Sequence, residues 1–219
     1  MSRSTLNITD TIENYIWQVG VRETTVMQQC REETAAMPNA NMQIAPEQGQ
    51  FLALLAQLTG AKRIIEVGTF TGYSALWMAS VLPEDGELIA CDISDEYTAK
   101  AEHYWQQAEI SSKISLKIQP ATESLAELLT VGQSGQFDML FIDADKTGYQ
   151  DYYEQGLQLL RQGGLMAFDN TLWSGSVAEP SEDPDTVALQ QFNRHVHGDQ
   201  RVDMGLLPIG DGLTLVRKK

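Results

Sequence analysis

The sequence contains few cysteines and no long apolar run, and each scarcity excludes a class of protein. Two cysteines occur among 219 residues, Cys30 and Cys91. Because Cys91 lies in the apolar stretch ELIACD, we interpret the cysteines as buried free thiols rather than as a disulfide or a metal pair. No stretch approaches the roughly 20 apolar residues of a membrane span, and the first residues lack the apolar core of a signal peptide. We therefore expect a cytoplasmic protein without a membrane anchor.

Basic residues are scarce as well. Lysine and arginine total 15 against 30 aspartates and glutamates, which gives a net charge of −15. This balance disfavours sequence-independent attraction to a phosphate backbone, although a local basic groove would be compatible with it. A nucleic acid is therefore not the expected partner.

The order of the patterns predicts one α/β domain over residues 1–219. Amphipathic stretches predict helices at residues 9–19 and 23–37. A third helix is expected to start at Pro46 and to end at Gly60, since proline is favoured in the first turn of a helix and glycine at its end. We divide the domain into an N-terminal helical cap, residues 1–45, and a Rossmann-like core, residues 46–219.

Five short apolar runs follow, each separated from the next by a helical pattern: RIIEVG, ELIACD, SLKIQ, FDMLFIDAD and GGLMAFDN. Apolar strands that alternate with helices are typical of a doubly wound parallel sheet. The last two runs, VDMGLLPIG and GLTLVRKK, are too close in sequence for any connection but an antiparallel hairpin. We predict a mostly parallel sheet of seven strands that ends in this hairpin, which departs from the ordinary dinucleotide-binding sheet.

The first strand leads into a glycine-rich turn, EVGTFTGYS. Its spacing, with Glu66 before Gly68 and Gly72, differs from the pyrophosphate-binding pattern. The acid suits an ammonium group or an ordered network below the turn, and a plain tight turn between strand and helix is the alternative for the whole motif. Asp92 at the end of the second strand is placed to accept both hydroxyls of a ribose, with a helix cap as the alternative. After the third strand, residues 120–121 form either a loop along an adenine or a plain turn.

Oxygen-bearing side chains follow the fourth and fifth strands. Asp143 ends the fourth strand, and Asp169 and Asn170 end the fifth. Together they form a half-shell of hard ligands for Mg²⁺ or a similar cation, with helix caps and turns as the alternative. We interpret Asp145 as a turn residue because strand alternation points it away from Asp143. Lys146 is either a general base, favoured by partial desolvation beside a cation, or a solvated surface lysine.

At these residues the sequence resembles the catechol/caffeoyl-CoA O-methyltransferase family. The resemblance extends from MQIAPEQGQFLALLAQLTGAKRIIEVGTFTGYSAL through FIDADKTGYQDYY and GGLMAFDNTLWSG to LPIGDGLTL. It implies the class I methyltransferase sheet, a metal held by Asp143, Asp169 and Asn170, and catalysis by Lys146 as base together with Asp143. The contacts that it implies to the methyl donor are Met42, Glu66, Gly68, Ser74, Asp92, Ala121 and Asp143.

The resemblance also implies cofactors and an assembly. The donor would be S-adenosylmethionine, which leaves as S-adenosylhomocysteine, and the cation would be Mg²⁺, with Ca²⁺ or Mn²⁺ as alternatives. We expect a homodimer, and the N-terminal helices either cover the acceptor pocket or form the dimer contact.

Two positions depart from the family pattern. Ile44 stands where plant members usually carry threonine or a similar residue, so a hydroxyl contact to the donor is lost. The loop after Trp173, SGSVAEPSEDPD, is short and acidic, unlike the plant segment that recognises coenzyme A. We therefore expect the acceptor to be a catechol-type hydroxyl of a small free phenol, such as caffeic acid or a flavonoid, ahead of caffeoyl-CoA. Trp173 either walls the phenol ring or packs in the core.

Two other functions remain open. Relatives within the family modify a hydroxylated uridine in tRNA, a reaction that the acidic composition disfavours. A binding module that kept the fold and lost catalysis is the third hypothesis. The retention of every implied ligand together with Lys146 argues against it.

Overall fold

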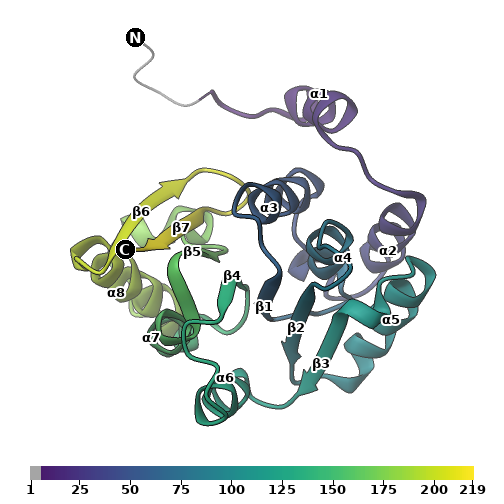
Figure 1. Ribbon diagram of the computed structural model, residues 1–219. Coiled ribbons are helices and arrows are strands. Elements are labelled where there is room, and N and C mark those ends of the chain that lie inside the picture. Colours follow the sequence, from purple (N-terminus) through teal and green to yellow (C-terminus); the bar gives the residue numbers. More distant parts are fainter. Residues whose placement is uncertain (1–5) are drawn as a thin grey trace.

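Apolar strands form the centre of the structure, a computed structural model that describes residues 6–219 (Figure 1). Residues 1–5, with which the predicted cap begins, lie outside the described residues. The described residues contain a sheet of seven strands in the order β3-β2-β1-β4-β5-β7-β6. In chain order the strands are β1 (Arg63–Val67), β2 (Glu87–Asp92), β3 (Ile114–Ile118), β4 (Phe137–Ile142), β5 (Leu160–Phe168), β6 (Val202–Leu207) and β7 (Leu213–Lys218).

The strand directions confirm the predicted topology. The pairs β1 with β2, β1 with β4, β2 with β3 and β4 with β5 are parallel. β7 pairs antiparallel with both β5 and β6, so the last two strands form the expected hairpin. The described residues therefore have the predicted Rossmann-like sheet with a C-terminal antiparallel hairpin, which is the arrangement that the resemblance implies.

Helices cover both faces of the sheet. Along β1, Ile64 packs into one apolar cluster and Ile65 into the other, because successive side chains of a strand point to opposite faces. One cluster lies under α2 (Thr25–Ala35), α3 (Pro46–Leu58), α4 (Tyr73–Ser80) and α5 (Asp95–Gln107). The other lies under α6 (Ala121–Thr130), α7 (Tyr149–Leu159) and α8 (Pro184–Gly198).

The helices begin where capping residues allow. Thr24 caps α2 by accepting a hydrogen bond from the Met27 amide at 3.3 Å, and Asp183 caps α8 with Pro184 in the first turn. Pro46 likewise stands in the first turn of α3, as predicted. The helices expected at residues 9–19 and 23–37 are α1 (Asp10–Gly20) and α2, so these predictions are correct to within two residues.

The N-terminal helices differ in how they join the core. α1 lies at the edge of the molecule and contacts α3, to which Trp17 donates a hydrogen bond at Glu47 (2.6 Å; Figure 1). α2 instead contacts α4 and α5, and the hydroxyl of Thr34 donates to that of Thr71 in the loop after β1 at 2.9 Å. α2 is thus bonded to the loop that follows β1.

Within residues 6–219, no helix combines the length and apolar character needed to cross a membrane.

Candidate active site

The site lies at the carboxyl edge of the sheet, where the chain order of the strands reverses direction around β1 and β4. Open α/β sheets bind ligands in the crevice at such a point. The ladder continues one residue past the strands: the Asp143 amide donates to the Val67 carbonyl at 2.8 Å and the Asp169 amide to the Ile142 carbonyl at 3.0 Å. The ends of β1, β4 and β5 are therefore held side by side.

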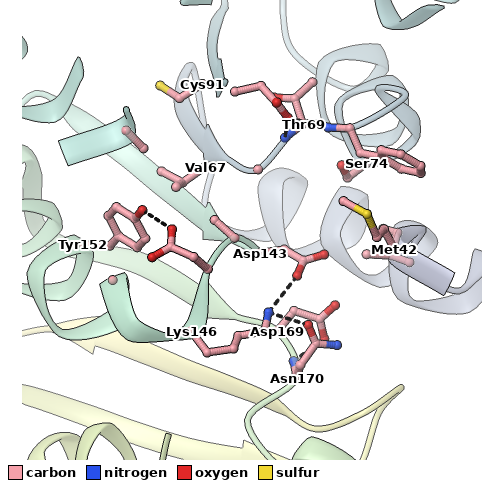
Figure 2. Close-up of a pocket in the computed structure, with 18 of the residues that line it drawn as sticks. Met42, Val67, Thr69, Ser74, Cys91, Asp143, Lys146, Tyr152, Asp169 and Asn170 are labelled. Atoms are coloured by element: carbon pink, nitrogen blue, oxygen red, sulfur yellow. Dashed lines mark hydrogen bonds and ion pairs between the residues drawn. The ribbon is translucent and has the colours of Figure 1, made fainter. Parts of the chain in front are cut away.

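A cavity of about 1320 Å³ opens at this edge. It exceeds the roughly 300–1,000 Å³ typical of a pocket for one small ligand, so it has room for more than one small molecule. The sequence-predicted residues that line the cavity are Met42, Gly68, Ser74, Asp92, Ala121, Asp143, Lys146, Asp169 and Asn170. Ten residues that surround it are labelled in Figure 2, with carboxylates and Lys146 gathered at one end.

The loop after β1 requires glycine at its start. Gly68 has a φ of +89°, and a Cβ at this position would lie 1.8 Å from the backbone oxygen of Asp143. Phe70 also adopts a left-handed conformation, with a φ of 50°, which costs a non-glycine residue about 1–2 kcal/mol. Such strain is maintained where the surroundings over-determine it, as they do at ligand-binding loops.

Asp92 orders this loop. One carboxylate oxygen accepts hydrogen bonds from the amides of Thr69 at 2.9 Å and Phe70 at 2.8 Å. The other accepts from the amides of Ile93 at 2.7 Å and Ser94 at 2.9 Å. A carboxylate offers about four acceptor positions, so backbone donors occupy all of them. The N-cap of α5 is Ser94, so the expected alternative of Asp92 as the cap residue is wrong.

Glu66 lies beneath the loop, fully buried and outside the cavity lining. The Thr69 hydroxyl donates to its Oε2 at 3.0 Å, while Oε1 has no hydrogen-bond partner among the described residues. Burial raises the pKa of Glu66 from 4.5 to about 8, and the nearby charges of Asp92 and Asp143 act in the same direction. A buried acceptor without a donor is costly, which favours the protonated, neutral form of this carboxyl.

Lys146 links the acidic strand ends. Its Nζ donates to Oδ1 of Asn170 at 2.7 Å, to the hydroxyl of Tyr149 at 2.8 Å and to Oδ1 of Asp143 at 3.2 Å (Figure 2 shows the contacts with Asp143 and Asn170). Lys146 is buried, so the alternative of a solvated surface lysine is wrong. The oxygens of Asp143 and Asn170 thus converge on one positive group.

The two strand-end aspartates hold protons unusually well. Burial, together with the negative charge of Asp143, raises the pKa of Asp169 from 3.8 to about 7. Burial also raises the pKa of Asp143, although the ammonium of Lys146 opposes the rise. Two carboxylates drawn out of water at one place attract a cation strongly.

The loop after β5 is strained. Asn170, Trp173 and Ser174 have φ values of 53°, 48° and 52°, in the left-handed region. Asparagine tolerates this conformation, but tryptophan and serine adopt it rarely. Trp173 lines the cavity, half-buried, with its ring centroid 5.6 Å from Nζ of Lys146. The ring therefore both lines the cavity beside Lys146 and packs against the apolar cluster under α6, α7 and α8, so the structure is compatible with both predicted roles.

Sequence reasoning missed two residues of the site. One is Tyr152, whose hydroxyl donates a hydrogen bond to Asp145 at 2.5 Å, and both Tyr152 and Asp145 line the cavity. This hydrogen bond directs the Asp145 carboxylate away from Asp143, as expected. The other is Tyr149, whose hydroxyl accepts a hydrogen bond from Lys146. Its position three residues after the lysine, close to one helical turn, is a signal that could have identified it.

A second acidic cluster lies outside the cavity. Glu154, His195 and Asp199 come within 4.8 Å of one another. Arg201 donates to Glu154 at 2.7 Å and to Asp199 at 2.5 Å, so an arginine already neutralises both carboxylates. We interpret this cluster as an ion-pair network.

Comparison with known proteins finds relatives along almost the whole chain. A family model described as O-methyltransferase matches residues 18–219. Probable caffeoyl-CoA O-methyltransferase 2 of Dictyostelium discoideum is 47% identical over 174 residues, which cover 78% of this chain and 75% of the relative. Catechol O-methyltransferase domain-containing protein 1 of Mus musculus is 41% identical over 211 residues, 94% of this chain and 80% of the relative.

Solved structures with the same fold include proteins with a bound donor or product. The O-methyltransferase TomG of Streptomyces achromogenes, in complex with SAM, superposes with a TM-score of 0.87 at 27% identity, covering 95% of this chain and 96% of that one. An O-methyltransferase of Bacillus cereus, in complex with SAH, gives a TM-score of 0.86 at 28% identity, with 95% and 97% covered.

Proposed function

The chain belongs to the O-methyltransferase family as an S-adenosylmethionine-dependent enzyme, and from this premise we propose that it methylates a catechol-type hydroxyl of a small phenol with the help of one divalent cation. The observation that carries the proposal is the convergence of Asp143, Asn170 and Lys146 at the strand ends beside the large cavity. Asp169, buried next to them, completes the set.

The chemistry of the donor set fits a hard cation. The proposed ligands are the carboxylates of Asp143 and Asp169 and the amide oxygen of Asn170. Mg²⁺, Mn²⁺ and Ca²⁺ accept such oxygen ligands, and this set contains no sulfur or imidazole ligand. A cation bound there would lower the pKa of a coordinated phenol and hold two adjacent oxygens. We expect Mg²⁺ because it prefers few protein ligands and completes its shell with water and substrate oxygens.

Lys146 is proposed as the general base. In its neutral form the Lys146 amine has a free lone pair and takes the proton of the phenolic hydroxyl, and the resulting phenolate oxygen attacks the methyl carbon of the donor. The bond from carbon to sulfur breaks with its electron pair left on sulfur, so the products are a methyl ether and S-adenosylhomocysteine. Asp143, in contact with Nζ, contributes both as a proposed metal ligand and by orienting the base.

Residues on the β1 and β2 side of the cavity are proposed to bind the methyl donor. Glu66 would act from beneath the loop, where it accepts from the Thr69 hydroxyl and adds negative charge below the ammonium group of the donor, and the glycine at position 68 allows a close approach of backbone to ligand. Asp92 would act chiefly by ordering the loop, since backbone amides occupy its acceptor positions. The remaining proposed contacts are Met42, Ser74, Ala121 and Asp143.

The charge of the cavity favours a neutral acceptor. Among the described residues that line it, six are aspartates and the basic one is Lys146. A coenzyme A thioester carries several phosphate charges, and a tRNA carries many more, so both would meet a negative field without arginine clamps. Small free phenols avoid this penalty.

The test is methylation of a catechol panel, with product detected by mass spectrometry. We expect product with donor and Mg²⁺, none after EDTA treatment, and at most about 1% of the wild-type rate for Asp169→Ala. Asp203→Ala, which changes an exposed aspartate on β6, should retain full activity. Metal-independent turnover would refute the cation, and methylation of undermodified tRNA in place of every phenol would favour the uridine acceptor. Donor binding without any methylation would favour a binding module.

A homodimer is part of the proposal. Large apolar side chains are exposed on α1 and α3, where Tyr15, Val19, Leu54 and Leu58 meet solvent. A second copy would cover such a surface. Light scattering at micromolar concentration should give twice the mass of the chain, and a monomeric mass would refute the expectation.

A further inference from the structure

The first residue of α7, Tyr149, is buried in an aromatic cluster directly behind Lys146. Its side chain is fully buried, and its ring packs against Phe168 with centroids 5.7 Å apart and against Phe192 with centroids 5.5 Å apart. Phe168 ends β5 and Phe192 lies in α8, so the ring is held from two elements. The tyrosine hydroxyl therefore has a fixed position relative to the strand ends.

The hydroxyl of Tyr149 both donates and accepts a hydrogen bond. It donates to the backbone carbonyl of Asp169 at 2.9 Å and accepts from Nζ of Lys146 at 2.8 Å. Because its proton points to the carbonyl, a lone pair is left facing the lysine. Burial raises the pKa of Tyr149 well above 10, so the group stays a neutral hydroxyl.

The remaining partners of Lys146 have other roles. Asp143 and Asn170, which also accept from Nζ, are proposed ligands of the cation. The tyrosine hydroxyl is not a proposed ligand, and its ring cannot move without repacking the aromatic cluster. Of the three contacts, the one with Tyr149 therefore does not depend on whether Asp143 and Asn170 bind a cation.

We propose that Tyr149 is a positioning residue that holds Nζ of Lys146 at the acceptor end of the cavity. This inference rests on the proposed role of Lys146 as the base. The hydroxyl fixes where the amine stands, so the phenolic proton meets a base at a defined point, and misplacement of a reacting group by about 1 Å reduces rates strongly.

The chain offers a matched control on the same helix. Tyr153 is also fully buried and packs against Phe168 and Phe192 at 6.1 and 6.0 Å. Its hydroxyl donates to Asp199 at 2.8 Å, away from the site. Tyr149→Phe and Tyr153→Phe thus each remove one hydroxyl from one aromatic cluster, and their melting temperatures should fall by similar amounts.

The experiment compares kcat, KM and structure for these variants. Tyr149→Phe should lower kcat about tenfold or more and leave the KM for the donor within about twofold, whereas Tyr153→Phe should keep kcat within about twofold. On a Lys146→Met background, Tyr149→Phe should cause no further loss. A crystal structure of Tyr149→Phe should show the lysine amine displaced or in several positions.

Each contrary result has a distinct meaning. Full kcat in Tyr149→Phe, an unmoved amine in its crystal structure, or the same fall in kcat on the Lys146→Met background would overturn the positioning role. High activity of Lys146→Met by itself would instead overturn the proposed base, and the positioning role with it.

Discussion

The buried carboxyl of Glu66 leads to a prediction about stability and donor binding. Replacement of Glu66 by glutamine keeps the shape of the side chain and removes its ability to ionise. In the folded chain Glu66 is fully buried, and its pKa is raised from 4.5 to about 8. The folded protein therefore holds this proton more tightly than the unfolded chain does.

The magnitude and its sign follow from linkage. An acid with a raised pKa in the folded state contributes stability that is fully present below pH 4.5 and is lost as the pH rises towards 8. Each pKa unit corresponds to about 1.4 kcal/mol. Raising the pH from 5 to 8 should therefore lower the free energy of unfolding by about 3 to 4 kcal/mol through the ionisation of Glu66. Glu66→Gln lacks this loss.

Urea unfolding of the ligand-free protein at both pH values measures the effect. At pH 5 the two proteins should have similar free energies of unfolding, and at pH 8 Glu66→Gln should be the more stable by about 3 kcal/mol. Glu123→Gln, at an exposed position of α6, should match the wild type at both values. A difference between Glu66→Gln and the wild type that stays constant with pH would refute the reasoning.

The same substitution should weaken the donor site. The ionised carboxylate of Glu66 beneath the loop would attract the ammonium of S-adenosylhomocysteine, so calorimetry at pH 8 should show a dissociation constant at least about tenfold higher for Glu66→Gln. The variant would be more stable yet bind less tightly, as is common where an active site carries strained or unpaired groups. Unchanged affinity would remove Glu66 from the donor site.

Two further predictions concern the loop after β1 and the thiols. Gly68→Ala should destabilise the protein far more than Gly132→Ala. Both glycines have a positive φ, but a Cβ at position 68 would lie 1.8 Å from the backbone oxygen of Asp143, whereas a Cβ at position 132 would meet nothing within 4 Å. Equal midpoints of urea unfolding for the two variants would contradict this contact. Cys30 and Cys91 are buried and unpaired, and burial raises the pKa of each to about 12, so iodoacetamide should label neither in the native protein at pH 8 and both in urea. Labelling of the native protein at the unfolded rate would contradict their burial.

Most of the fold was predictable because its signals are local in sequence. Apolar runs of strand length, alternating with helical patterns, identify the strands, and the short connection before β7 leaves only an antiparallel hairpin. Acids that follow buried strands were also predictable as neighbours, because parallel strands end at one edge of a sheet. For this reason the sequence pattern is enough to group Asp143, Asp169 and Asn170.

Other features needed the tertiary structure. Asp92 accepts hydrogen bonds from amides of two separate segments, and the hydroxyl of Tyr149 donates to the backbone carbonyl of Asp169. Glu66 is fully buried beneath the loop that follows it. A hydrogen bond acts over about 3 Å and depends on direction, so it is decided by how remote segments pack.

The sequence by itself therefore determined the order of the elements, the edge of the sheet where the cavity opens and the acids gathered there, since these follow from periodicity and chain direction. The tertiary structure alone decided which hydrogen-bond acceptors stay unpaired, which side chains are buried and which groups bond to Lys146. Burial and hydrogen-bond geometry arise from contacts between residues that are distant in the chain.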